Sequence, residues 1–269
     1  MIITKDPNGD VNVEFHARLP LVYLDNWAIS NSLSRDETRR WRFLDIFRMK
    51  GTLLFSWANV IELSNQTLPI KALLDGIGEH WWPIEWNPFA AIRKEHTYAA
   101  GETSPAISET FVTAYYPHIH GGALTLTSVL DLLRHDNTAN AKVRKAELTD
   151  AVQKFVNETK AKLRRNRNWL DQQYPSLPFD PQKPAFFVFT ELLRMLASEK
   201  NFTFTPNDGL DLFHATVPAA YGDFVLLDTT WTRRVRNLHM PGRTVYAFAE
   251  PELDQFLDAF ESCVIVPSI

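Results

Sequence analysis

The sequence predicts an α/β fold with a mostly parallel central sheet, and two observations lead to this prediction. Short apolar runs, typical of strands buried on both faces, occur near both ends of the chain, at residues 20–24, 52–55 and 224–227. Segments with helical spacing of apolar residues lie between and after these runs. Strands that alternate with helices form parallel sheets covered by helices.

Periodicity and punctuation define the elements at the two ends of the chain. Gly51 ends a helix over residues 35–50, and Ser56 is a natural N-cap for the helix after the second strand. Pro251 suits the start of the last helix. The expected elements of the last region are, in order, a helix at 208–221, a strand at 224–227, a helix through Arg236, a strand at 244–248, a helix at 252–260 and a final strand at 263–266.

The middle of the chain has a different character. It shows no convincing strand alternation, and residues 139–169 and 185–199 read as helices on either side of a proline-rich turn. We therefore expect a single domain over residues 1–269. Its sheet would be built from about 20–67 and 202–266, interrupted by a helical insertion at about 68–200.

Composition limits the class of protein. The 269 residues are 45% hydrophobic with a net charge of −4, which favours a packed globular core and argues against a uniformly basic nucleic-acid coat. No apolar run approaches the roughly 20 residues that span a bilayer, and the N-terminus lacks a secretion signal. Cys263 is the only cysteine, so no internal disulfide forms. We expect a cytoplasmic protein without a membrane partner.

Four carboxylates are expected to meet at one edge of the sheet. Asp25 and Asp228 each directly follow a predicted strand, and parallel sheets bind ligands beyond the carboxyl ends of their strands. Glu62 lies about two turns into the helix after the second strand, and Asp211 lies near the start of a helix. Such acids repel by roughly 1–4 kcal/mol per close pair, so a fold that gathers them favours a bound cation, with Mg²⁺ or Mn²⁺ suiting oxygen ligands.

The motifs that carry these acids resemble, in order, those of PIN-domain proteins, which include toxin-type ribonucleases. They are residues 22–29 (VYLDNWAI), 54–63 (LFSWANVIEL), 207–214 (NDGLDLFH) and 221–228 (YGDFVLLD). The resemblance covers about 20–66 and 205–248 and implies a PIN-like three-layer fold. The ligands that it implies for the metal ions are Asp25, Glu62, Asp211 and Asp228, with Asp208 and Asp223 as additional acids at the same edge.

Several polar residues near these acids are candidates for supporting or substrate-binding roles. The resemblance implies supporting roles for Asn26 and Ser56. Arg233 and Arg234 lie just past Asp228 and are placed to meet phosphates. His214, one turn beyond Asp211, could touch a phosphate, although a histidine on an apolar helix more often packs in the core.

Three further motifs have both a functional and a structural interpretation. His118 and His120 have the spacing of two ligands on one strand face, but no third ligand is evident, which favours a packing role. The tryptophans at 81, 82 and 86 could stack on bases, yet such density is more common in cores and interfaces. The basic run 160–167 could steer an RNA backbone or simply form a solvated helix face.

The sequence therefore predicts a metal-dependent endoribonuclease that hydrolyses phosphodiester bonds with cation-activated water. RNA is the expected substrate and DNA the alternative. The resemblance to toxins also implies a homodimer and leaves room for an antitoxin or other regulatory partner. One rival is a PIN-like module that binds RNA or protein without cutting. Another is a phosphatase resembling the haloacid dehalogenase superfamily, for which Asp223 and Asp228 would hold the metal, although Trp27 stands where that family has a second aspartate.

Overall fold

Five parallel strands form the central sheet. The computed structural model describes residues 2–5, 11–14, 16–63, 69–97, 104–115, 125–135, 139–166, 168–199 and 204–263. The strand order is β5-β4-β3-β6-β7, and every neighbouring pair is parallel. The strands are β3 (Leu21–Leu24), β4 (Thr52–Ser56), β5 (Trp81–Ile84), β6 (Phe224–Leu226) and β7 (Tyr246–Phe248). The predicted α/β class is confirmed.

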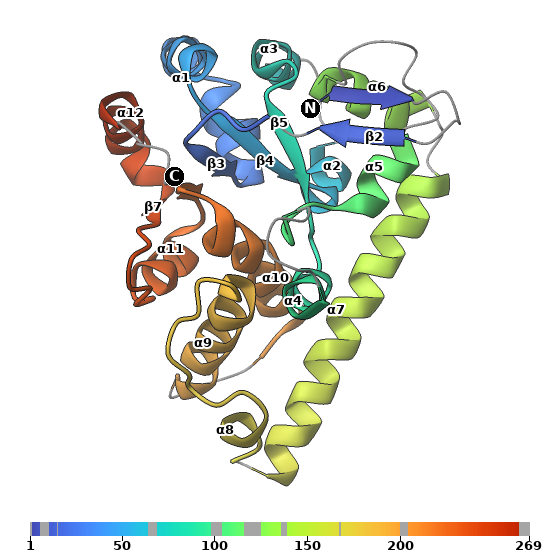
Figure 1. Ribbon diagram of the computed structural model, residues 1–269, viewed down its shortest axis with the longest axis vertical. Coiled ribbons are helices and arrows are strands. Elements are labelled where there is room, and N and C mark those ends of the chain that lie inside the picture. The colour runs from blue at the N-terminus through green and yellow to red at the C-terminus, as the bar shows by residue number, and fades with distance from the viewer. Residues whose placement is uncertain are drawn as a thin grey trace.

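Helices cover both faces of the sheet, which gives three layers (Figure 1). One face carries α1 (Glu37–Met49), α3 (Pro69–Ile77), α6 (Leu126–His135) and α12 (Leu253–Ser262). The other carries α4 (Pro88–Thr97), α7 (Ala139–Arg165), α9 (Pro184–Ser198), α10 (Pro206–Tyr221) and α11 (Thr229–Arg236). Shorter elements are η1 (Ala28–Leu33), α2 (Trp57–Leu63), α5 (Glu109–Tyr115), α8 (Trp169–Gln173), η3 (Glu250–Glu252) and an antiparallel hairpin of β1 (Ile2–Lys5) and β2 (Val11–Glu14).

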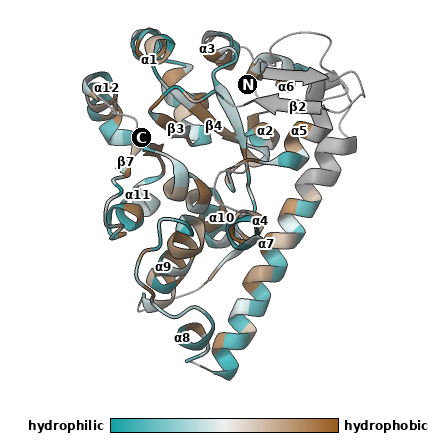
Figure 2. Cartoon of the chain, viewed as in Figure 1, coloured by the Kyte–Doolittle hydropathy of each residue, from teal (hydrophilic) through white to brown (hydrophobic). Residues whose placement is uncertain are grey.

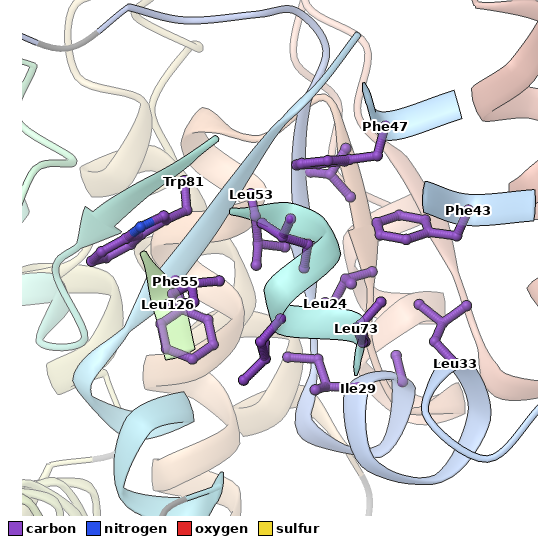
Figure 3. Packing of buried hydrophobic residues seen from close by; sticks show 14 of the residues in the cluster. Leu24, Ile29, Leu33, Phe43, Phe47, Leu53, Phe55, Leu73, Trp81 and Leu126 are labelled. Atoms are coloured by element: carbon purple, nitrogen blue, oxygen red, sulfur yellow. The ribbon is translucent and has the colours of Figure 1, made fainter. Parts of the chain in front are cut away.

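Aromatic packing holds the first helical layer against the sheet. Phe43 and Phe47 of α1 stack with ring centroids 5.3 Å apart, and Phe43 also packs against Phe260 of α12. Figure 3 shows the rings of Phe43 and Phe47 beside strand residues that point to the same face, such as Leu53. Each fully buried phenylalanine contributes about 2–3 kcal/mol of transfer free energy. Gly51, at a φ of 111°, turns the chain from α1 into β4, where a Cβ would crowd Phe47 and Phe260.

The second layer is organised around α10. Strand side chains such as Tyr23, Leu54 and Val225 alternate to this face and pack in one cluster with α7, α9 and α10. Gly209 lets α10 approach α7 closely, because a Cβ there would stand 2.6 Å from the Val156 side chain. The long helix α7, which falls in the predicted helical insertion, therefore packs mainly against α10, with further contacts to α2 and α8.

One element corrects the sequence analysis. The range 68–200 was expected to hold no strand, yet β5 lies within it and forms an edge of the sheet. Trp81 is fully buried on one face and Trp82 is partly buried on the other, so no apolar–polar alternation marks the strand. Pro83 is tolerated because the strand is at an edge. The segment after Ser104 covers that edge, through an antiparallel bridge between Ile84 and Ile107.

Hydropathy follows the layers. In Figure 2, β3 and β4 are largely brown, whereas the part of α7 that is not grey is mostly teal with scattered brown residues. Val152 and Val156 of α7 are buried, and the mean hydropathy of the whole chain is −0.21. Of the helices in the described ranges, none is sufficiently long and apolar to cross a bilayer.

Candidate functional site

The switch in strand order places two acids side by side. From β3 the chain continues to β4 on one side, and β6 returns on the other, so a crevice is expected at the carboxyl ends of β3 and β6. Asp25 follows β3 and Asp228 follows β6 by two residues. The Asp25 backbone N–H donates to Leu226 O at 3.1 Å, which extends the pairing of the two strands up to these acids.

Asp211 reaches the same edge from α10. This helix enters β6 through a short turn, so it runs opposite to the strands and its first turns lie at their carboxyl ends. The Trp231 side chain of α11 forms a hydrogen bond with the Asp211 carboxylate. Burial first, and then the charge of Asp228, raise the pKa of Asp211 to about 7. Asp25 and Asp208 raise this pKa further, so four aspartates share one region.

Asp25 also has a perturbed carboxyl group. Burial raises its pKa to about 6, and the charge of Asp228 adds to the increase. The backbone N–H of Asn26 opposes this effect by donating to Asp25 Oδ1 at 2.7 Å. Asp228 is itself the N-cap of α11, with Oδ1 accepting from the backbone N–H groups of Thr230 and Trp231 at 2.7 and 3.0 Å. Asp228 therefore caps α11 and lies at the site as well.

A chain of polar groups brings Glu62 to the same edge. The Asn26 side-chain amide donates to Glu62 Oε2, and Asn59 Nδ2 donates to Asn26 Oδ1 at 3.3 Å. Asn59 Oδ1 accepts from both the backbone N–H and the hydroxyl of Ser56 at 2.9 Å. Glu62 is exposed, whereas Asn26, Ser56 and Asn59 are buried. The predicted supporting residues Asn26 and Ser56 thus connect β3, β4 and α2 below Glu62.

Two of the predicted acids, Asp223 and Asp208, have structural roles away from the cluster of Asp25, Asp211 and Asp228 or beside it. Asp223 precedes β6, and its Oδ2 accepts from the Leu21 N–H at 2.7 Å at the start of β3. It lies at the amino ends of the strands, opposite Asp25 and Asp228, so its predicted place at the same edge is wrong. Asp208 forms a capping box with Thr205, whose backbone N–H and hydroxyl both donate to Asp208 Oδ2. Asp208 nevertheless acts electrostatically on Asp211.

The substrate-binding candidates divide into accessible and enclosed side chains. Arg233 is exposed on α11. Arg234 is 6% exposed, pairs with Glu199 Oε1 at 2.6 Å and lies 4.6 Å from the Trp231 ring centre. That engagement removes Arg234 from a phosphate-binding surface. The His214 side chain is partly exposed, but its Nε2 atom is buried, and burial lowers its pKa to about 4, so the ring is neutral near pH 7.

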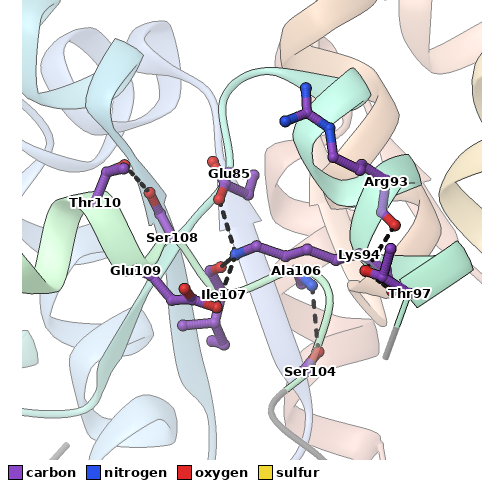
Figure 4. Close-up of polar contacts among 10 residues, drawn as sticks. All are labelled: Glu85, Arg93, Lys94, Thr97, Ser104, Ala106, Ile107, Ser108, Glu109 and Thr110. Carbon is purple, nitrogen blue, oxygen red and sulfur yellow. Dashed lines mark hydrogen bonds and ion pairs between the residues drawn. The ribbon is translucent and has the colours of Figure 1, made fainter. Parts of the chain in front are cut away.

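Sequence reasoning missed an acid at the end of β5. Glu85 directly follows this strand, as Asp25 follows β3, but β5 itself was not predicted. In Figure 4 the Lys94 ammonium lies among Glu85, Ile107 O and Glu109, at 3.0, 2.6 and 3.4 Å. Lys94 compensates the buried carboxylate, whose pKa is raised by burial. Glu85 therefore stabilises the segment that covers the sheet edge.

Tyr23, Asn59 and Trp231 were also missed as site residues. Tyr23 lies on β3 two residues before Asp25, and its side chain is buried. Burial first, and then the charges of Asp25, Glu62 and Asp211, raise the pKa of its hydroxyl. The signal for Asn59 was its spacing of three from Ser56, which fits a reciprocal helix cap. Nothing in the sequence pattern distinguished Tyr23 from an ordinary strand residue.

The remaining motifs pack in the core, lie on the surface of α7 or fall outside the described residues. Trp81 packs against Phe55 and Phe111, and Trp86 packs against Phe213. In the basic run, Lys162, Arg164 and Arg165 are exposed near the end of α7, with Lys162 Nζ 5.1 Å from the Trp169 ring centre. His118, His120, Arg167 and residues 264–266 of the expected final strand lie outside the described residues.

The described acidic side chains do not form a preorganised metal-binding site. Across the ranges described above, no three His, Cys, Asp or Glu side chains are grouped so as to hold one ion. Several carboxylate oxygens are instead bonded to protein donors, as at Glu62 and Asp228. Comparisons of the chain with models of known families, with curated proteins and with solved structures found no match.

Proposed function

We propose that the protein is a metal-dependent nuclease, with RNA as its substrate, whose site comprises Asp25, Glu62, Asp211 and Asp228. The observation that carries the proposal is that the charge of Asp228 acts on the carboxyl groups of both Asp25 and Asp211, at the switch point of a parallel sheet. Perturbed carboxyl groups at such a crevice are typical of functional sites. The order of these acids along the chain also resembles that of PIN-domain nucleases.

The donor set fits Mg²⁺ or Mn²⁺ by its chemistry. Carboxylate oxygens are the ligands that these hard cations prefer, and a cation would offset the repulsion that raises the pKa of Asp211. The Tyr23 hydroxyl, which is buried near these acids without a well-formed hydrogen bond to any described residue, is a further sign that the site accommodates an additional group. Because the carboxylates are not grouped in advance, binding requires side-chain rotation at Glu62 and Asp228.

The chain's own groups would position the substrate. Divalent cations at such a site activate a water molecule and stabilise the leaving oxygen of a phosphodiester. Arg233 is exposed five residues after Asp228 and carries the positive charge best placed to attract a phosphate. Asn26 donates a hydrogen bond to the Glu62 carboxylate, and Asn59 donates in turn to Asn26. This buried network positions the Glu62 side chain. A homodimer, an antitoxin and a cytoplasmic location belong to the same proposal through the resemblance alone.

Substitution of the strand-end acids tests the proposal. Asp25→Asn and Asp228→Asn should each lower cleavage of a single-stranded RNA in Mn²⁺ by at least about 100-fold, with circular dichroism unchanged. Asp223→Asn is the matched control, because Asp223 lies at the opposite end of β6 and asparagine still accepts the Leu21 N–H. Full cleavage by both strand-end variants would remove the proposed mechanism. A DNA strand of the same sequence tests the choice of RNA.

A second candidate is a module that binds RNA without cutting it. The absence of a preformed metal group among the described side chains favours this alternative. Calorimetry with Mn²⁺ separates the two, because a nuclease binds the ion and loses affinity in Glu62→Gln. No measurable Mn²⁺ binding by the parent protein, together with retained RNA binding, would favour the module.

The phosphatase interpretation loses its main support. It requires Asp223 and Asp228 to hold one metal, yet the two residues lie at opposite ends of β6. Asp223 is instead bonded to the first residue of β3. A phosphatase of that kind would therefore lack its metal site.

A further inference from the structure

The hydroxyl of Tyr23 is buried, and no described residue forms a hydrogen bond of good geometry with it. The residue is 1% exposed. Tyrosine hydroxyls almost always find a partner when buried, because an unpaired one is unfavourable. The tyrosine therefore needs a functional explanation or a partner that this arrangement does not supply.

The neighbouring Asn59 amide lies within hydrogen-bonding reach of this hydroxyl, but its donors and acceptor are already engaged elsewhere. Both of its amide hydrogens are used, on Leu24 O at 3.4 Å and Asn26 Oδ1 at 3.3 Å. Its oxygen already accepts two hydrogen bonds from Ser56. The hydrogen-bonding capacity of this asparagine is thus complete.

The remaining polar neighbours are carboxylates. Side chains two apart on a strand point to the same face, so Tyr23 and Asp25 both face the layer of α10, which carries Asp211. Among these acids the charge of Asp25 acts most strongly on the hydroxyl. Asp25 Oδ1 accepts from the Asn26 N–H, and its second oxygen has no hydrogen bond within the described part of the chain.

We propose that Tyr23 is a positioning residue for the divalent cation, donating its hydroxyl hydrogen to the second carboxylate oxygen of Asp25 when the ion is bound. This inference rests on the proposed function. Asp25 would then be held from both sides, by Asn26 through Oδ1 and by Tyr23 through Oδ2. Such partners of metal-binding side chains fix their orientation, and their loss weakens metal affinity by about 10- to 100-fold.

The proposal makes opposite predictions for the metal-free and metal-bound protein. In Tyr23→Phe the unpaired hydroxyl is removed and the ring is kept, so the metal-free Tm should stay the same or rise. With Mn²⁺ present, the same variant lacks the hydrogen bond to Asp25. Its Kd for Mn²⁺ should be about tenfold weaker than that of the parent, and its Mn²⁺-induced rise in Tm correspondingly smaller.

Tyr221 provides a matched control on the same side of the sheet. Its hydroxyl donates to Glu95 Oε1 at 2.6 Å, at the end of α10 remote from the acids. Tyr221→Phe should lower the metal-free Tm and leave the Kd for Mn²⁺ unchanged, which is the reverse of the pattern for Tyr23→Phe.

Calorimetry and thermal unfolding of the full chain with Mn²⁺ decide the matter. A Kd for Tyr23→Phe within about twofold of the parent value would overturn the role of Tyr23 and leave the nuclease proposal intact. A lowered metal-free Tm, or failure to fold, would also overturn it, since the hydroxyl would then already be bonded without metal. If the parent protein itself binds no Mn²⁺, the proposed function fails and this inference fails with it.

Discussion

Asp228 lies near enough to Asp211 for its charge to raise the pKa of the Asp211 carboxyl group, which burial has already increased, to about 7. The two residues come from different elements, the N-terminal part of α10 and the N-cap of α11. Trp231 connects them physically, because its backbone N–H donates to Asp228 and its side chain bonds to Asp211. Without a cation, the fold therefore holds an unfavourable pair of carboxylates.

The first prediction concerns pH. The pKa of Asp211 is about 7 in the folded protein and about 3.8 when unfolded, so the folded state binds more protons between these values. The free energy of unfolding should therefore fall as pH rises from about 4 through 7. In chelator, Asp211→Asn should raise it by about 2 kcal/mol at pH 8, after allowing for partial solvent screening, and change it little at pH 4.

Urea unfolding at the two pH values measures this difference. The analogous change at Asp223, which lies far from these acids, serves as the control. Equal effects of Asp211→Asn at pH 4 and pH 8 would show that the charge of Asp211 does not destabilise the fold. Part of the pH dependence should persist in the variant, because the pKa of Asp25 is also raised, to about 6.

The adjacent arginines of α11 should respond differently to substitution. Arg233 is exposed, so Arg233→Ala should leave the Tm unchanged and weaken RNA binding, with a smaller dependence of affinity on salt. Arg234 is buried against Glu199 and Trp231, so Arg234→Ala should lower the free energy of unfolding by about 2 kcal/mol. Thermal unfolding and RNA titration at two salt concentrations measure both. A large loss of Tm in Arg233→Ala would contradict its assignment as a free surface charge.

Glu95 should be a major stabilising residue outside the site. From α4 it accepts hydrogen bonds from Ala185 N–H, Phe186 N–H and the Tyr221 hydroxyl at 2.6, 3.0 and 2.6 Å, and so caps the start of α9. Glu95→Ala leaves these donors unpaired and should lower the free energy of unfolding by about 3 kcal/mol. Glu95→Gln, which keeps an acceptor oxygen, should lose less. Mn²⁺ affinity should not change in either variant, and a change there would indicate coupling that these contacts do not explain.

Much of the candidate site could be predicted because parallel strands end together. Asp25 and Asp228 directly follow apolar runs, and that position alone places them at one edge. The same reasoning failed for Asp223, which precedes its strand. An acid close to a strand in sequence can lie at either the amino or the carboxyl end of that strand. The strand β5 was missed because Trp81 and Trp82 are apolar on both faces. The hydroxyl of Tyr23 could not be singled out, since hydrogen-bonding capacity depends on neighbours distant in sequence.

The contact between α10 and α7 should tolerate no added methyl group. A Cβ at Gly209 would stand 2.6 Å from Val156 Cγ2 and 3.0 Å from Val152 Cγ1. Gly209→Ala should therefore lower the free energy of unfolding by about 1–3 kcal/mol, through overpacking. Gly209→Ala combined with Val156→Ala should recover part of that loss, and urea unfolding compares the two. An unchanged stability for the single variant would mean that α7 packs more loosely than these distances indicate.

The last prediction uses Asn26, which holds the exposed carboxylate of Glu62. Asn26→Asp replaces the amide donor to Glu62 with a second carboxylate and sets two negative charges against each other. At pH 8 in chelator the free energy of unfolding should fall by about 1–2 kcal/mol, the lower part of the range for a close pair near solvent. Saturating Mn²⁺ should restore most of this loss, because the cation offsets the added charge.

Asn26→Ala separates charge from lost hydrogen bonding. It also breaks the bonds to Glu62 and Asn59, yet adds no carboxylate, so Mn²⁺ should stabilise it no more than it stabilises the parent. Thermal unfolding of the three proteins with and without Mn²⁺ gives the comparison. If Mn²⁺ stabilises Asn26→Asp and Asn26→Ala equally, the ion does not sit beside residue 26. The cation would then have to be placed nearer Asp211 and Asp228, whose mutual repulsion is independent of Asn26.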